Sequence, residues 1–130
     1  MIQRIQSIFL VVISIVSAVF YFYLPSFDFS GLGLTTFPLF KSYLILSGGL
    51  SLLTMLLFKR RKLQLSMNRF HCFLQAFVSA FLLFEMVSSG DFNTYLLILI
   101  MPLLALILLI LSSRAIRKDE DLVRSIDRLR

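Results

Sequence analysis

The residues of this chain that could do chemistry are few, and they do not assemble into a catalytic set. The single His and the single Cys, His71 and Cys72, are neighbours in the sequence. A metal centre or a nucleophilic site needs further ligands or a base, and the 130 residues hold no second His or Cys. We therefore predict no catalytic residue, no metal site and no cofactor. His71 is expected to make ordinary hydrogen bonds near one end of a helix, and Gln75 to bond across helices.

Lys41 and Glu85 form a second candidate, an ion pair inside a largely apolar region. If residues 39–58 and 70–87 pair as a helical hairpin, both side chains lie at nearly the same depth. The alternative is that Lys41 extends to the lipid headgroups while Glu85 reaches water. Either arrangement gives Glu85 a structural role rather than a role in proton coupling.

The C-terminal segment, residues 114–130, offers a third candidate, a surface for a partner protein. Oppositely charged residues at i,i+4 spacing, such as Glu120 and Arg124, support a helix there. A helix of this length is marginal in water, so its apolar stripe must rest on the membrane surface, on a basic loop or on a partner. Charges of both signs argue against a purely electrostatic membrane anchor. The predicted docking face consists of Ile116, Leu122, Val123, Ile126 and Leu129.

Composition and hydropathy predict the elements that position these residues. The chain is 58% hydrophobic and only 15% charged, with a mean hydropathy of +0.91, whereas soluble chains carry about 25% charge. These values exclude an ordinary soluble domain, and a single Cys excludes an internal disulfide. A helix needs about 20 apolar residues to cross a bilayer. Such segments are predicted at residues 5–24, 39–58, 70–87 and 95–111.

Short connections at residues 25–38, 59–69 and 88–94 make successive segments antiparallel neighbours. The predicted fold class is an all-α integral membrane protein. Residues 1–113 form a four-transmembrane-helix antiparallel bundle, and residues 114–130 form a cytoplasmic amphipathic helix. The first segment is expected to stay in the protein, because its apolar stretch exceeds the roughly 7–15 residues of a signal peptide. Pro102 is expected to bend the last segment.

The distribution of charge predicts the orientation of this bundle. Every Lys and Arg except Lys41 falls at one end, in the N-terminus, the 59–69 loop or the C-terminal segment. The positive-inside rule then places both termini in the cytoplasm. All tyrosines lie at the opposite ends of the segments, as an interfacial belt would. The basic run Lys59, Arg60, Arg61 and Lys62 either binds anionic headgroups, at about 1 kcal/mol per charge, or serves only as a topology determinant.

The third segment has two contrasting faces at helical spacing. One face is a row of phenylalanines, expected to contact lipid or a partner protein: Phe70, Phe73, Phe77, Phe81 and Phe84. The opposite side is expected to face the bundle interior: Cys72, Ala76, Ser79 and Leu83, flanked by Gln75 and Met86. In the second segment, Gly48 and Gly49 are expected to pack closely on a neighbouring helix rather than to break their own helix.

The two ends of the chain carry a resemblance. The start, MIQRIQS, and the close, RAIRKDEDLVRSIDRLR, together resemble an uncharacterised family of small four-span inner-membrane proteins of Bacteroidota. That family carries no assigned activity, so the resemblance implies no functional residue. It implies a location in the bacterial inner membrane.

A non-enzymatic accessory or scaffold subunit of a larger inner-membrane complex fits these observations best. Its expected partners are membrane lipids and other inner-membrane subunits. Nucleic acid is not expected, because no aromatic platform accompanies the basic run. The alternative is a small homo-oligomeric transporter or channel. The small multidrug exporters are similar in size and span number, but their key carboxylate lies in the first span, which is uncharged here. A membrane enzyme, such as a thiol–quinone oxidoreductase, would lack the groups it needs.

Overall fold

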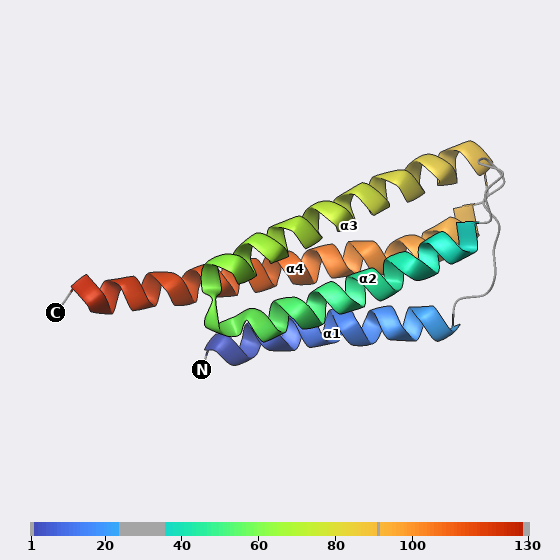
Figure 1. The fold of residues 1–130 in the computed structure, drawn as a ribbon. Helices are drawn as coiled ribbons and strands as arrows, with labels where there is room; N and C mark the ends of the chain where they lie inside the picture. The colour runs from blue at the N-terminus through green and yellow to red at the C-terminus, as the bar shows by residue number, and fades with distance from the viewer. Residues whose placement is uncertain (1, 24–35, 91, 129–130) are drawn as a thin grey trace.

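All regular secondary structure in the part of the chain that the structure describes is helical. The structure is a computed structural model and describes residues 2–23, 36–90 and 92–128. Four α-helices and one short 3-10 helix follow in the order α1 (Ile2–Tyr23), α2 (Thr36–Leu56), η1 (Leu57–Lys59), α3 (Arg61–Ser89) and α4 (Phe92–Arg128). The N-terminus, the connection from α2 to α3 and the C-terminus lie toward one end of the molecule (Figure 1). The connection from α3 to α4 lies at the other end.

Several helices have the length and composition of membrane-spanning helices. Within the described residues, three helical stretches are long and apolar enough to cross a membrane, namely Leu39–Leu56, Arg61–Ser89 and Phe92–Lys118. α1 contributes a shorter apolar stretch, Ser7–Tyr23. A helix satisfies its own backbone hydrogen bonds, which is what a bilayer interior requires. The prediction of an all-α fold is therefore confirmed for the described residues. Three of the four predicted segments have the length and composition of membrane spans, and the crossing of a bilayer, by α1 above all, stays a prediction.

The expected basic loop at residues 59–69 is wrong, because α3 already begins at Arg61. The segment is polar but contains no Gly or Pro, and Leu, Gln and Met are good helix formers. The chain reverses instead through η1 and Arg60, whose φ of −114° and ψ of 74° are not helical. A drop in hydropathy marks where a helix leaves the apolar zone, and it does not mark where the helix begins.

The connection from α3 to α4 is shorter than the one from α2 to α3. α3 ends at Ser89, and Gly90 adopts a left-handed φ of 72° with its N–H bonded to the Met86 carbonyl at 3.3 Å. This is the glycine cap that ends many helices. Because α4 starts at Phe92, the expected turn at residues 88–94 is shorter than predicted.

α4 is the longest helix, with 37 residues, and continues through Pro102 into the C-terminal segment. The predicted helix at residues 114–130 is therefore confirmed as far as Arg128, and it is continuous with the last apolar segment. Figure 1 shows the C-terminal part of α4 extending beyond the ends of the other helices.

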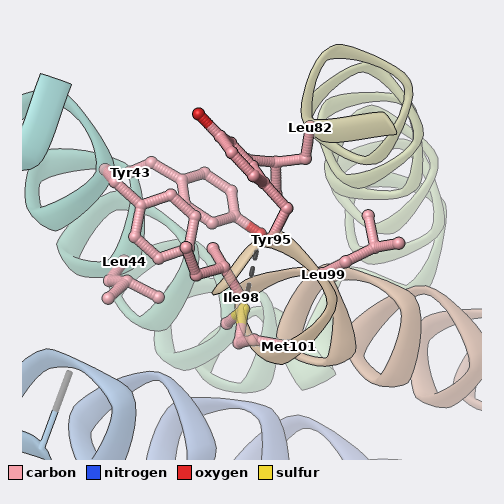
Figure 2. Close-up of a cluster of buried hydrophobic side chains, with 8 residues drawn as sticks. Tyr43, Leu44, Leu82, Tyr95, Ile98, Leu99 and Met101 are labelled. Carbon is pink, nitrogen blue, oxygen red and sulfur yellow. Dashed lines mark hydrogen bonds between the residues drawn. The ribbon is translucent and has the colours of Figure 1, made fainter. Parts of the chain in front are cut away.

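The helices pack unequally. α1 packs extensively on α2 and α4, and α3 packs on α4, whereas α2 and α3 approach each other less closely. One apolar cluster joins α2, α3 and α4, and Figure 2 shows it around Tyr43, Leu82 and Tyr95. A second cluster joins α1 and α4 through Leu10, Ile13, Ala105 and Leu109.

Small residues allow the close approach of α1 and α2. A Cβ added to Gly48 would meet the Ser17 Cβ at 3.5 Å, whereas one added to Gly49 would meet no atom within 4 Å. Of the two glycines, only Gly48 therefore packs as predicted. A shallow groove of about 190 Å³ beside it is lined by both helices, including Ser14 and Leu44.

Candidate functional site: a buried polar seam

One face of α3 carries a continuous row of buried polar side chains, which we call the polar seam. Its members recur every three or four residues from Gln64 to Ser79, and Glu85 follows two such steps later, so they share one side of the helix. The seam consists of Gln64, Asn68, His71, Gln75, Ser79 and Glu85. The apolar Leu82 occupies the same buried face between Ser79 and Glu85. Buried polar side chains also lie on two other helices, at Ser47, Ser51 and Thr54 of α2 and Ser112 of α4.

The centre of the seam is a hydrogen-bonded network between α2 and α3. The Tyr43 hydroxyl donates to Gln75 Oε1. Gln75 Nε2 donates to Ser47 Oγ at 2.8 Å and lies 2.9 Å from His71 Nε2. Ser47 Oγ is 3.0 Å from the same His71 nitrogen. Tyr43 also reaches toward α4, with its hydroxyl 3.5 Å from the Met101 sulfur (Figure 2).

The contact with Gln75 favours one tautomer of His71. An amide nitrogen can only donate, so in a hydrogen bond between the two residues His71 Nε2 is the acceptor. A neutral imidazole with an accepting Nε2 carries its proton on Nδ1. That Nδ1–H is buried and has no hydrogen-bond partner among the residues that the structure describes.

At the end of the seam nearer the N-terminus of α3, Asn68 links α3 to α4. Its Nδ2 donates to the Leu109 carbonyl at 3.0 Å and to Ser113 Oγ at 2.7 Å. A carbonyl oxygen has two lone pairs, so Leu109 can accept this bond besides its helical one. One amide side chain therefore fixes the register of two membrane helices.

Among the described residues, other buried polar atoms, in the seam and on the helices beside it, have no partner. In the described part of the chain, no hydrogen bond reaches Ser51 Oγ, Gln64 Oε1, Gln64 Nε2, Asn68 Oδ1, Glu85 Oε2 or Ser112 Oγ. A buried polar group without a partner costs about 1–3 kcal/mol. Polar residues in a membrane interior are costly and are therefore the usual candidates for a functional site.

The two residues of the predicted ion pair have different surroundings. The Lys41 ammonium lies 5.0 Å from the centre of the Tyr21 ring on α1, a distance suited to a cation–π interaction. Glu85 is only 3% exposed and belongs to the seam. Contact between Lys41 and Glu85 stays a prediction.

The predicted outer face of α3 is confirmed, and its predicted inner face is wrong in part. The phenylalanines Phe70, Phe73, Phe77, Phe81 and Phe84 are all exposed. However, Ala76 and Leu83 are exposed as well. The buried face of α3 is centred on His71, Gln75 and Ser79 instead. The prediction judged the interior by side-chain size, whereas hydrogen-bonding capacity decides which side chains avoid lipid.

Sequence reasoning missed Gln64 and Asn68 because it placed them in a loop. The signal was present, since polar residues recur at helical spacing from Gln64 to Glu85. His71 was expected near a helix end with ordinary hydrogen bonds. It is instead fully buried at the centre of the network. Cys72 is half-buried beside the α1–α4 cluster.

The predicted docking and headgroup residues differ in how far their side chains are exposed, and some of those side chains lie outside the described residues. Ile116 is 1% exposed and packs within the chain itself, so it cannot belong to a docking face. Leu122 is 44% exposed, whereas the side chains of Val123, Ile126 and Leu129 lie outside the described residues. In the basic run, Arg60 and Lys62 are exposed and Arg61 is half-buried; the Lys59 side chain also lies outside the described residues.

The described residues thus form an all-helical bundle whose helices are apolar enough to cross a membrane and whose interior carries a polar face. Over residues 2–129, the chain matches the model of a family described as a domain of unknown function, DUF4293. The chain belongs to that family, in agreement with the resemblance of its two ends to an uncharacterised family. No curated protein and no solved structure matches it.

Proposed function

We propose that this protein is a non-enzymatic accessory or scaffold subunit of a complex in the bacterial inner membrane. It spans the membrane as an antiparallel bundle of four helices, with both termini in the cytoplasm. The concentration of basic residues at one end of the chain supports this orientation. The apolar lengths of α2, α3 and α4 support the spans.

The observation that carries this proposal is the extension of α4 beyond the bundle (Figure 1). Arg114, Arg117 and Lys118 are exposed on this helix, as expected for residues at headgroup level. The helix continues without a break past them to Arg128.

A continuous helix cannot turn to lie flat on the membrane surface. The extension therefore points away from the lipid, where an isolated segment of this length is marginal. An amphipathic stripe that includes the exposed Leu122 then gains stability by packing on another protein. The docking face that we propose consists of Leu122, Val123, Ile126 and Leu129.

Extraction of a tagged chain in mild detergent, followed by sizing and native mass spectrometry, tests this proposal. We expect a partner subunit at fixed stoichiometry, and deletion of residues 123–130 should release it. Replacement of the outward Phe73 by Leu is the matched control and should retain the partner. A chain that purifies without any partner, or a deletion that leaves the partner bound, would contradict the docking proposal.

A second function, a small transporter or channel, is favoured by one specific observation. On one face of α3 the interior of the bundle holds a buried carboxylate, a buried His and unpartnered amide groups, and buried hydroxyls without a partner in the described chain lie on α2 and α4, at Ser51 and Ser112. The uncharged first segment argued against this class, but the polar groups lie on the third helix. Ion or solute movement in reconstituted vesicles would distinguish this function from that of an accessory subunit.

A further inference from the structure

We propose that the polar seam is a proton path across the membrane, with His71 as its internal relay and Leu82 as its dry barrier. This inference rests on the second function proposed above and names the transported species. It replaces the expectation that Glu85 has a structural role only.

The seam is long enough to cross the bilayer. At about 1.5 Å of rise per residue, the stretch from Gln64 to Glu85 covers about 30 Å, the thickness of the hydrocarbon core. Both end residues are buried and carry unpartnered polar atoms within the described chain. Gln64 lies at the basic end of the molecule, and Glu85 lies one turn before the Gly90 cap at the other end.

Its unpartnered atoms point to water as the missing partner. Buried waters in proteins bond to polar groups that the chain itself leaves unsatisfied. The backbones of α2 and α3 approach each other at fewer points than those of α1 and α2, so the space between α2 and α3 is filled by side chains and can admit water beside the network. Water bonded to Gln64, Asn68 and Ser51 would give a hydrogen-bonded chain from the basic end to His71.

The His71 network has the arrangement that a relay needs. Ser47 Oγ lies 3.0 Å from Nε2, the nitrogen that carries the lone pair, and the proton of the ring sits on the unpartnered Nδ1. In one transfer, the Ser47 hydroxyl proton moves to His71 Nε2. Ser47 then takes a proton from the next water or hydroxyl of the hydrogen-bonded chain. The Nδ1 proton then leaves to water on the other side, and the ring ends neutral. Rotation or reverse tautomerisation of the imidazole resets the relay.

The chemistry favours a proton over a larger ion. Tyr43, Ser47, His71 and Gln75 contact one another directly at hydrogen-bond distances, which leaves no passage for a hydrated cation. A proton needs only a chain of such bonds. Glu85 is the one acidic residue of the seam, and it can collect protons at the end opposite the basic residues.

Leu82 interrupts this chain. It is 1% exposed and lies on the seam face between Ser79 and Glu85, within the apolar cluster of Figure 2. It offers no hydrogen bond, so protons must cross it through transient water. The structure thus assigns to Leu82 the slow step of the path.

Proton flux into vesicles tests the proposal. The full chain is reconstituted into vesicles with an internal pH-sensitive dye, and a potassium gradient with valinomycin supplies the driving potential. We expect flux above that of protein-free vesicles. Leu82→Ser should raise it several-fold, whereas His71→Gln and Glu85→Gln should lower it to the protein-free level. The outward variant Phe77→Leu should leave it unchanged.

The outcomes separate the two claims. If the chain passes sodium or a solute but no protons, the transporter function stands and the proton path is overturned. If nothing crosses, both are overturned. Normal flux in His71→Gln, together with a wild-type sizing profile, would remove His71 from the path. A Leu82→Ser protein that folds and conducts no better than wild type would remove the barrier.

Discussion

The two faces of α3 differ in a way that reverses the rule of soluble proteins. The outward face carries phenylalanines, with Phe73 71% exposed, whereas the inward face carries amides, His71 and Glu85, all buried. In water the apolar face would turn inward. In lipid there is no hydrophobic force between helices, so the groups that need hydrogen bonds turn to the interior and the groups that need none face the acyl chains. The inward face of α3 therefore carries the side chains whose hydrogen bonds join this helix to α2 and α4.

The largest effect is expected when the outward face receives a charge. Replacing Phe77 with Asp places a carboxylate against the acyl chains, at a cost of about 2.5–3.5 kcal/mol near the centre of a span. We expect the yield of membrane-inserted protein to fall sharply, measured as the ratio of membrane to insoluble fractions. Phe77→Leu should insert normally. Normal insertion of Phe77→Asp would mean that this face does not contact lipid.

Replacing Gln75, which lies on the inward face and contacts three other side chains, should have the next largest effect. Gln75→Leu keeps the volume approximately but deletes the bonds to Tyr43, Ser47 and His71. A buried group left without its partner costs about 1–3 kcal/mol, so we expect a clear fall in the thermal midpoint in detergent. Ala76→Leu, on the neighbouring exposed position, is the control. If both variants melt at the wild-type temperature, the network does not hold α2 to α3.

A smaller effect is expected at Asn68, which links α3 to α4. Interhelical hydrogen bonds in membranes average about 0.6 kcal/mol in double-mutant cycles. Asn68→Ala should therefore destabilise the protein slightly, and Ser113→Ala should add little to it because both remove the same 2.7 Å bond. Fully additive losses in the double variant would show that the two side chains do not interact.

The smallest effect is expected for a conservative change on the outward face. Phe73→Leu keeps the face apolar, and surface substitutions usually change stability by less than about 0.5 kcal/mol. We expect an unchanged thermal midpoint and an unchanged partner profile. A lost partner with normal stability would show that the phenylalanine row contacts protein rather than lipid, which would break the comparison.

Much of the fold could be predicted because hydropathy is a local signal. The apolar segments around Leu39, Phe70 and Tyr95 and the helical C-terminal segment all follow from residue type and spacing. The start of α3 could not be placed by the same signal, since Arg61 to Arg69 are polar and still helical. The seam was missed for that reason, as two of its members, Gln64 and Asn68, lay in the supposed loop.

The sequence by itself determined the class of the protein, because the transfer of apolar and charged residues between water and lipid depends on each residue almost independently. It also determined that the phenylalanines share one face of α3. Only the tertiary structure decided which side chains meet. Tyr43, Ser47 and Gln75 are brought together from two helices, and Ile116 is covered by the chain itself. Such contacts depend on the register of the helices and on the distance between them, and the spacing of residues along a single helix determines neither.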